Sequence, residues 1–128
     1  MLDTTTIALL GLYIAKCRHR PEGVDVFEVW SDARSDHPGL SRLAKTHSYR
    51  LVRRLVKRGL LVEMGTAPAS RRGTKTLYAP TEKGLQKYPE LVGQAIQEMS
   101  NAPSWRTLYG FADLISSLEF THKAAIPK

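Results

Sequence analysis

Residues 47–63 read His-Ser-Tyr-Arg-Leu-Val-Arg-Arg-Leu-Val-Lys-Arg-Gly-Leu-Leu-Val-Glu, and their pattern predicts an amphipathic helix over 47–58. At about 100° per residue, one side of this helix is an apolar stripe of Leu51, Val52, Leu55 and Val56. The opposite side holds four cations: Arg50, Arg53, Arg54 and Lys57. Like charges four residues apart repel one another on a helix surface. A polyanion such as DNA would relieve that repulsion, so this face indicates a nucleic-acid partner.

A β-hairpin is predicted directly after this helix. Gly59 follows the helix and is predicted to form its C-terminal glycine cap. Residues 60–64 predict a short strand and residues 76–79 the returning strand, joined by a long, flexible, cationic tip over 65–75. Thr81 then caps the start of another helix.

Two helices are predicted before the basic helix. The first begins at Asp3 or Thr4 and ends near Lys16. It is apolar nearly all round, which indicates burial on more than one side, and a partner subunit could cover the second side. The second helix covers residues 24–34. Residues 40–45 form either a short separate helix or the lead-in to the basic helix.

The segment after the hairpin is also predicted to be helical. Pro89 either interrupts the helix that starts near position 81 or begins the next one. Residues 89–99 and 104–118 predict two more helices, of which the second is strongly apolar. Residues 121–128 predict a frayed tail. The first helix and residues 104–118 together predict a dimer, because a lone domain of this size would leave them exposed.

Three carboxylates lie on one face of the helix predicted over 24–34: Asp25, Glu28 and Asp32. They could form a metal or acid–base site, but no histidine or further carboxylate is placed to complete one, so a solvated acidic face is the favoured interpretation. The chain has no P-loop, GxGxxG, HExxH or GxSxG motif, and its four histidines show no metal spacing. We therefore expect neither an enzyme nor a metal or other cofactor.

The positive charge of the chain is concentrated in one third of it. The 128 residues carry a net charge of +7. Residues 42–87 contain twelve basic and two acidic residues, a net +10, whereas the other 82 residues carry −3. This asymmetry favours a surface that faces a polyanion. Cys17 is the single cysteine, which excludes a disulfide scaffold.

The sequence gives no sign of a membrane span or an export signal. The longest apolar stretch, over 7–15, is far shorter than the roughly 20 residues that a span requires. Asp3 and three threonines stand where a signal peptide would have positive charge. We therefore expect a cytoplasmic protein.

Residues 48–63, together with Leu-Tyr-Ala-Pro-Thr-Glu-Lys-Gly at 77–84, resemble the recognition helix and wing of PadR-like transcriptional regulators, with MarR-like regulators as the second choice. These families commonly have a Leu-x-x-x-Gly-Leu pattern at the end of the recognition helix and Tyr-x-Leu-Thr-x-x-Gly after the wing. Here Pro80 replaces the usual leucine. The resemblance implies a mainly α fold with a small β-hairpin: a winged helix-turn-helix over 1–88, dimerising C-terminal helices over 89–120, and a flexible tail over 121–128.

The resemblance also implies roles for the basic residues. Residues at the start of the recognition helix would contact base edges in the major groove: Thr46, His47, Ser48, Tyr49, Arg50, Arg53 and Arg54. Neighbouring cations would contact phosphates: Arg42, Lys45, Lys57 and Arg58. Cations of the wing would reach the minor groove or the backbone beside it: Arg71, Arg72 and Lys75.

The function expected from these observations is sequence-specific binding of double-stranded DNA by a homodimeric transcriptional regulator. One alternative is a winged-helix module for protein interaction or assembly, in which the acidic face or the C-terminal aromatic residues bind the partner. Another is an accessory factor of replication or of a mobile element that binds nucleic acid without sequence preference.

Overall fold

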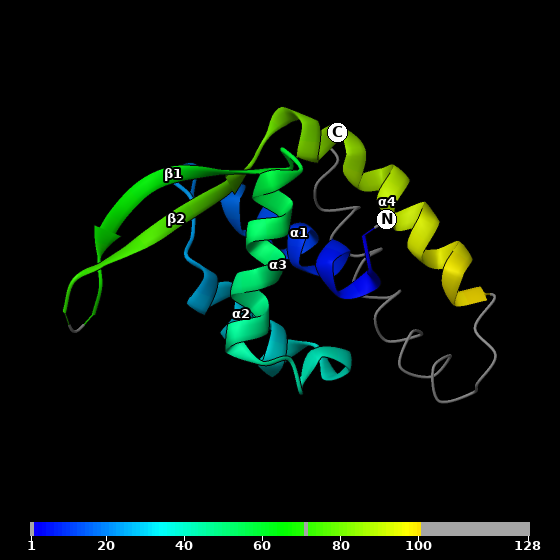
Figure 1. Cartoon of the computed structure of the whole chain (residues 1–128), viewed down its shortest axis with the longest axis horizontal. Coiled ribbons are helices and arrows are strands. Elements are labelled where there is room, and N and C mark those ends of the chain that lie inside the picture. Colours follow the sequence, from blue (N-terminus) through cyan, green and yellow to red (C-terminus); the bar gives the residue numbers. More distant parts are fainter. Residues whose placement is uncertain (1, 71, 101–128) are drawn as a thin grey trace.

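The computed structural model describes residues 2–70 and 72–100. In chain order they form α1 (Thr4–Cys17), α2 (Val26–Asp36), the 3₁₀ turn η1 (Pro38–Leu40), α3 (Lys45–Lys57), β1 (Leu61–Pro68), β2 (Thr74–Pro80) and α4 (Glu82–Ser100). The two strands pair antiparallel, and this hairpin projects from the helices (Figure 1). The predicted class, mainly α with a small β-hairpin, is confirmed.

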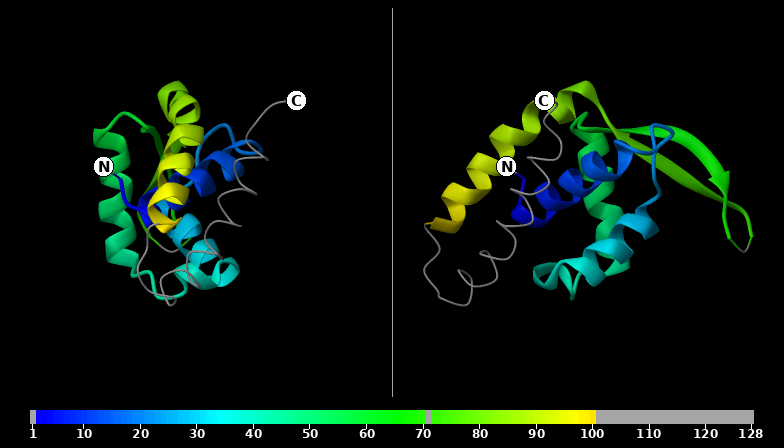
Figure 2. Two further views of the ribbon diagram at one scale, coloured as in Figure 1. Left: turned by 90° about the vertical axis from the view of Figure 1, so that its right-hand side faces the viewer. Right: turned by 180° about the vertical axis from the view of Figure 1, so that it is seen from behind.

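Helix α1 is the centre of the core. Asp3, one of the two residues at which the sequence allowed this helix to begin, caps it by accepting a hydrogen bond from the Thr6 backbone N–H at 2.8 Å. The helix packs against α2, α3, α4 and β2 (Figure 2). Leu10 and Tyr13 are fully buried. Burial of a leucine side chain such as that of Leu10 contributes roughly 1.5–3 kcal/mol. The chain itself therefore covers α1 on both sides, and this helix needs no partner subunit.

Helix α2 starts two residues later than predicted because the backbone of Val24 is used elsewhere. Val24 exchanges two hydrogen bonds with Tyr78 of β2, at 2.9 and 2.8 Å. Gly23 precedes this contact with φ +98°, and a Cβ there would lie 2.8 Å from the Tyr78 carbonyl oxygen. The segment before α2 thus forms an isolated antiparallel bridge with β2, and this bridge connects the hairpin to the helices.

Helix α3 begins at Lys45, two residues earlier than predicted. Residues 40–45 are not a separate helix: η1 ends at Leu40, and a turn leads into α3. Ser48, Leu51, Val52 and Leu55 form its buried side, with Val56 half-buried.

The C-terminus of α3 has the geometry expected of a glycine cap. Gly59 has φ +76°, its N–H donates to the Val56 carbonyl, and the Leu60 N–H donates to the Leu55 carbonyl. These are the two hydrogen bonds of a Schellman motif, and Leu55 and Leu60 are both buried beside them.

The hairpin is longer and its tip is shorter than predicted. Residues 65–75 are not a flexible loop, since β1 continues to Pro68 and β2 begins at Thr74. Gly65 has φ +125° beside a bulge, which interrupts the register without ending the strand. Pro68 occupies the last pair of the ladder, where a missing N–H costs little. Gly and Pro therefore mark a bulge and a strand end here, not a loop.

Helix α4 is continuous through Pro89, so the two helices that were predicted on either side of this proline are one. Tyr88, Val92 and Ala95 are buried, and α4 packs on α1. This packing compensates for the backbone hydrogen bond that the proline removes, and Pro89 itself is exposed. The expected domain boundary between residues 88 and 89 falls inside this helix. The helix predicted over 104–118 and the tail over 121–128 lie outside the described residues.

The junction between α3 and α4 is closely packed. Thr81 caps α4 as predicted: its hydroxyl accepts from the Gly84 N–H at 2.9 Å and donates to the Gly59 carbonyl at 2.5 Å. A Cβ on Gly84 would lie 2.2 Å from the Leu60 carbonyl oxygen. Only glycine allows α4 to approach the end of α3 this closely.

This contact predicts opposite effects for two glycines of α4. Gly84→Ala should lower the free energy of unfolding by about 1–3 kcal/mol, because the backbone at Leu60 must move. Gly93→Ala should raise it by about 0.5–1 kcal/mol, because that position is exposed and open and alanine favours the helix. Urea denaturation followed by circular dichroism measures both. Equal effects of the two substitutions would contradict the close approach at Gly84.

Candidate nucleic-acid interface

The exposed side of α3 and its C-cap form a surface of five cations, here called the basic face: Arg50, Arg53, Arg54, Lys57 and Arg58. All five line one shallow pocket of about 600 Å³. The described residues offer them a single acidic partner, Asp3, whose carboxylate lies 3.8 Å from the Arg54 guanidinium. Both side chains of that pair are about half exposed, so the contact is weak. The basic face is therefore largely uncompensated.

The residues predicted for base contact do not all reach the surface. Thr46 and His47 are exposed in the first turn of α3, and Tyr49 is 39% exposed. The prediction for Ser48 is wrong: it is 1% exposed, and its hydroxyl donates to the Ala44 carbonyl at 3.1 Å. Ser48 lies on the same buried side of the helix as Leu51 and Val52, and its hydroxyl is hydrogen-bonded to the helix backbone.

The residues predicted for phosphate contact are all exposed: Arg42, Lys45, Lys57 and Arg58. Lys45 also lies over the Phe27 ring, with its Nζ 5.0 Å from the ring centroid. That contact places its ammonium group beside α2. Ala44, which precedes Lys45, has no side chain that caps α3. The first N–H groups of the helix are therefore left for another acceptor.

A groove of about 1100 Å³ lies between α2, the first half of α3 and the hairpin. Its lining includes both charges and aromatic rings: Asp25, Phe27, Lys45, Tyr49, Arg53, Lys75 and Tyr78. Burial raises the pKa of the Tyr78 hydroxyl, and Glu63 adds to the effect while nearby Arg53 opposes it. Tyr78 therefore stays neutral in the groove at physiological pH and can donate a hydrogen bond.

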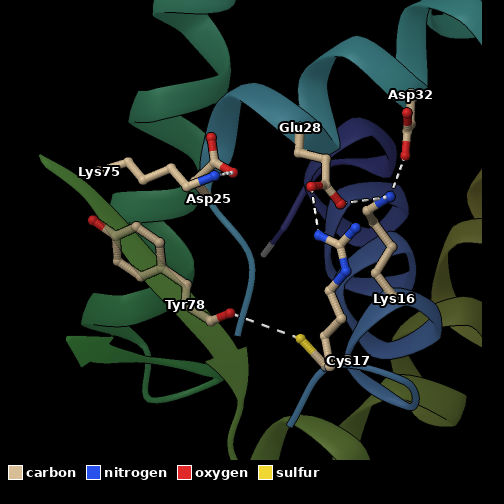
Figure 3. Close-up of polar contacts among 8 residues, drawn as sticks. Lys16, Cys17, Asp25, Glu28, Asp32, Lys75 and Tyr78 are labelled. Carbon is tan, nitrogen blue, oxygen red and sulfur yellow. Dashed lines mark hydrogen bonds and ion pairs between the residues drawn. The ribbon is translucent and has the colours of Figure 1, made fainter. Parts of the chain in front are cut away.

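The cations predicted for the wing differ in their surroundings. Arg72 is exposed at the tip of the hairpin. Lys75 is not in a loop but in β2, and its Nζ lies 3.5 Å from Asp25 Oδ1 (Figure 3). Arg71 lies outside the described residues. No local pattern of the sequence indicated the Asp25–Lys75 contact, because the hairpin brings together residues that are far apart in the chain.

The acidic face of α2 is internally paired, so the interpretation as a solvated face is wrong. Lys16 of α1 contacts both Asp32 and Glu28, the latter at 2.9 Å (Figure 3). Arg20 lies 2.5 Å from Glu28. A cluster of three or more possible metal ligands is absent from residues 2–70 and 72–100. The carboxylates of α2 thus join α2 to α1 and to the hairpin.

These ion pairs shift the pKa values of their members. Burial alone would lower the pKa of Lys16, but hydrogen bonds to Asp32 and Glu28 outweigh it and the pKa is raised. Burial alone would raise the pKa of Glu28, but hydrogen bonds from Arg20 and Lys16 lower it below its ordinary value. Both groups are therefore charged throughout the neutral range.

The lowered pKa of Glu28 predicts a pH-dependent contribution to stability. Its carboxylate stabilises the fold above its ordinary pKa of 4.5, and this contribution is lost as the pH falls through the lower folded pKa. Glu28→Gln should therefore lower the free energy of unfolding by about 1 kcal/mol at pH 7, and this deficit should shrink as the pH falls below about 4. Urea denaturation from pH 3 to pH 7 tests this.

The matched control is Glu90→Gln, which removes an exposed carboxylate 3.5 Å from Lys87 on α4. It should change stability by less than about 0.5 kcal/mol. A deficit for Glu28→Gln that is the same at every pH would show that its charge does not stabilise the fold.

Among residues 2–70 and 72–100, the structure contains no helix with the length and hydropathy of a membrane span. Comparison with models of protein families, with curated proteins and with solved structures found no significant match.

Proposed function

We propose that the protein binds double-stranded DNA through α3 and acts as a transcriptional regulator. The observation that carries this proposal is the basic face, which presents five cations on one exposed surface. Among the described residues, Asp3 is the one acid paired with them. Repulsion between Arg50 and Arg54, four residues apart, makes this face unfavourable in isolation. DNA phosphates remove the repulsion and release their own counterions, which favours binding.

The shape of α3 supports insertion into the major groove. An α-helix fits that groove, and its N-terminal residues then lie nearest the bases. Thr46, His47 and Tyr49 are exposed there, and Arg50 and Arg53 follow on the basic face. Arginine recognises guanine with two hydrogen bonds, so these two arginines are the residues that we assign to base recognition. Lys57 and Arg58, at the other end of the helix, would bind phosphates.

The position of the hairpin supports its proposed role as a wing. It projects beyond the helices (Figure 1), with Arg72 exposed at its tip. In the proposed complex the hairpin lies along the DNA backbone or the minor groove beside α3. The uncapped start of α3 adds N–H groups that favour a phosphate at the same edge.

The alternative of a protein partner on the acidic face of α2 receives less support from the structure. Glu28 and Asp32 are paired with Lys16, and Asp25 with Lys75, so a partner would have to break these contacts before it could bind. Binding to nucleic acid without sequence preference uses the same basic face as the proposed function, and it is an outcome of the experiment below.

We predict that the protein enriches a DNA motif from a randomised duplex pool. Arg50→Ala and Arg53→Ala should each weaken binding to that motif by about 1–3 kcal/mol and relax the preference for a base. Fluorescence anisotropy across about 50 to 300 mM salt measures the affinity and its salt dependence. Arg18→Ala is the matched control, since it removes one exposed cation just after α1 and away from the basic face.

Three results would count against the proposal. Equal losses for Arg18→Ala and Arg53→Ala would show that only net charge matters. An affinity that falls steeply with salt, with no enriched motif, would show that the basic face binds polyanions without sequence preference. Absence of binding at low salt would exclude the function.

We also predict a homodimer. The apolar pattern of the sequence over 104–118 supports this, although α1 no longer does. Multi-angle light scattering at micromolar concentration should give twice the mass of the 128-residue chain, and the enriched motif should be a palindrome, because a two-fold dimer reads two half-sites. A monomer together with a motif that lacks symmetry would overturn this prediction.

A further inference from the structure

The ion pair between Asp25 and Lys75 lies inside the groove that faces the proposed DNA site. Lys75 Nζ is 3.5 Å from Asp25 Oδ1, which is too long for a good hydrogen bond, and the lysine side chain is 41% exposed (Figure 3). Tyr49 and Arg53 of α3 line the same groove. A cation that could contact a phosphate is thus held by an acid of its own chain.

Asp25 has a second possible role that it does not fill in this structure. It occupies the N-cap position of α2, where aspartate usually accepts a hydrogen bond from an N–H of the first helical turn. Its side chain makes no such bond. The carboxylate therefore has two alternative sets of partners: the Lys75 ammonium group, or the free N–H groups at the start of α2.

We propose that Lys75 exchanges Asp25 for a DNA phosphate when the hairpin docks, and that Asp25 then turns back to cap α2. This inference rests on the proposed DNA binding. The exchange removes an ion pair but gains a phosphate contact and a helix cap, so its net cost is small. Asp25 acts as a restraint that keeps the affinity for DNA below the value that the positive charge alone would give.

Asp25→Asn tests the restraint, because asparagine caps a helix as well as aspartate does but has no charge to hold Lys75. We expect it to tighten binding to duplex DNA by about three- to tenfold. Asp36→Asn is the matched control: it makes the same change in net charge at an exposed position at the C-terminal end of α2, outside the groove. It should change the affinity by less than about twofold.

Lys75→Met tests the exchange itself, because it keeps an apolar stem and removes the charge. If Lys75 contacts a phosphate in the complex, Lys75→Met should lower the slope of log affinity against log salt by about one. In the Lys75→Met background, Asp25→Asn should lose most of its gain. Circular dichroism and urea denaturation should show that each variant folds. Asp25→Ser, a second uncharged cap, replaces Asp25→Asn should that variant be unstable.

The outcomes separate this inference from the proposed function. Wild-type protein that binds no duplex would exclude the DNA function, and the exchange with it. Wild-type binding with equal effects of Asp25→Asn and Asp36→Asn would overturn the restraint alone. An unchanged salt slope for Lys75→Met, or a gain from Asp25→Asn that persists without Lys75, would show that Lys75 never transfers to DNA.

Discussion

The end of α3 and the start of α4 are joined by one small set of backbone contacts, and the relative positions of α3, the hairpin and α4 depend on it. The Thr81 hydroxyl binds the Gly59 carbonyl, the Thr81 N–H binds the Leu60 carbonyl, and Gly84 lets the two backbones touch. Both ends of the hairpin are therefore anchored at the C-terminus of α3. Because the anchor is made of backbone groups and one hydroxyl, it leaves the charged side chains of α3 free.

The distribution of ion pairs explains why one surface remains so positive. The acids of α2 are used in holding α2 to α1 through Lys16 and to the hairpin through Lys75. Among the described residues, Asp3 is the one acid paired with a cation of the basic face. The fold thus separates its charges: compensated pairs stabilise the helices, and uncompensated cations form the surface that we assign to DNA.

The groove beside α3 is lined both by residues of the internal ion pairs and by residues of the surface proposed to contact DNA. Arg53 and Tyr49 belong to the surface proposed to contact DNA, whereas Asp25 belongs to the set of internal pairs, and Lys75 lies between them. A lysine in this position can bind either the Asp25 carboxylate or a DNA phosphate. This position links the stability of the hairpin contact to the proposed affinity for DNA, since the same ammonium group cannot satisfy a carboxylate and a phosphate fully at the same time.

The sequence by itself determined the elements whose signals are local. The apolar stripe of α3, the Gly59 cap, the Asp3 and Thr81 caps and the segregation of charge were all predictable, because each depends on residues within a few positions of one another. Tertiary structure decided the rest. Pro89 is tolerated inside α4 because that helix packs on α1. The strands extend through Gly65 because they pair with each other, and the carboxylates of α2 find cations distant in sequence. Such contacts follow from long-range packing, which no local pattern encodes.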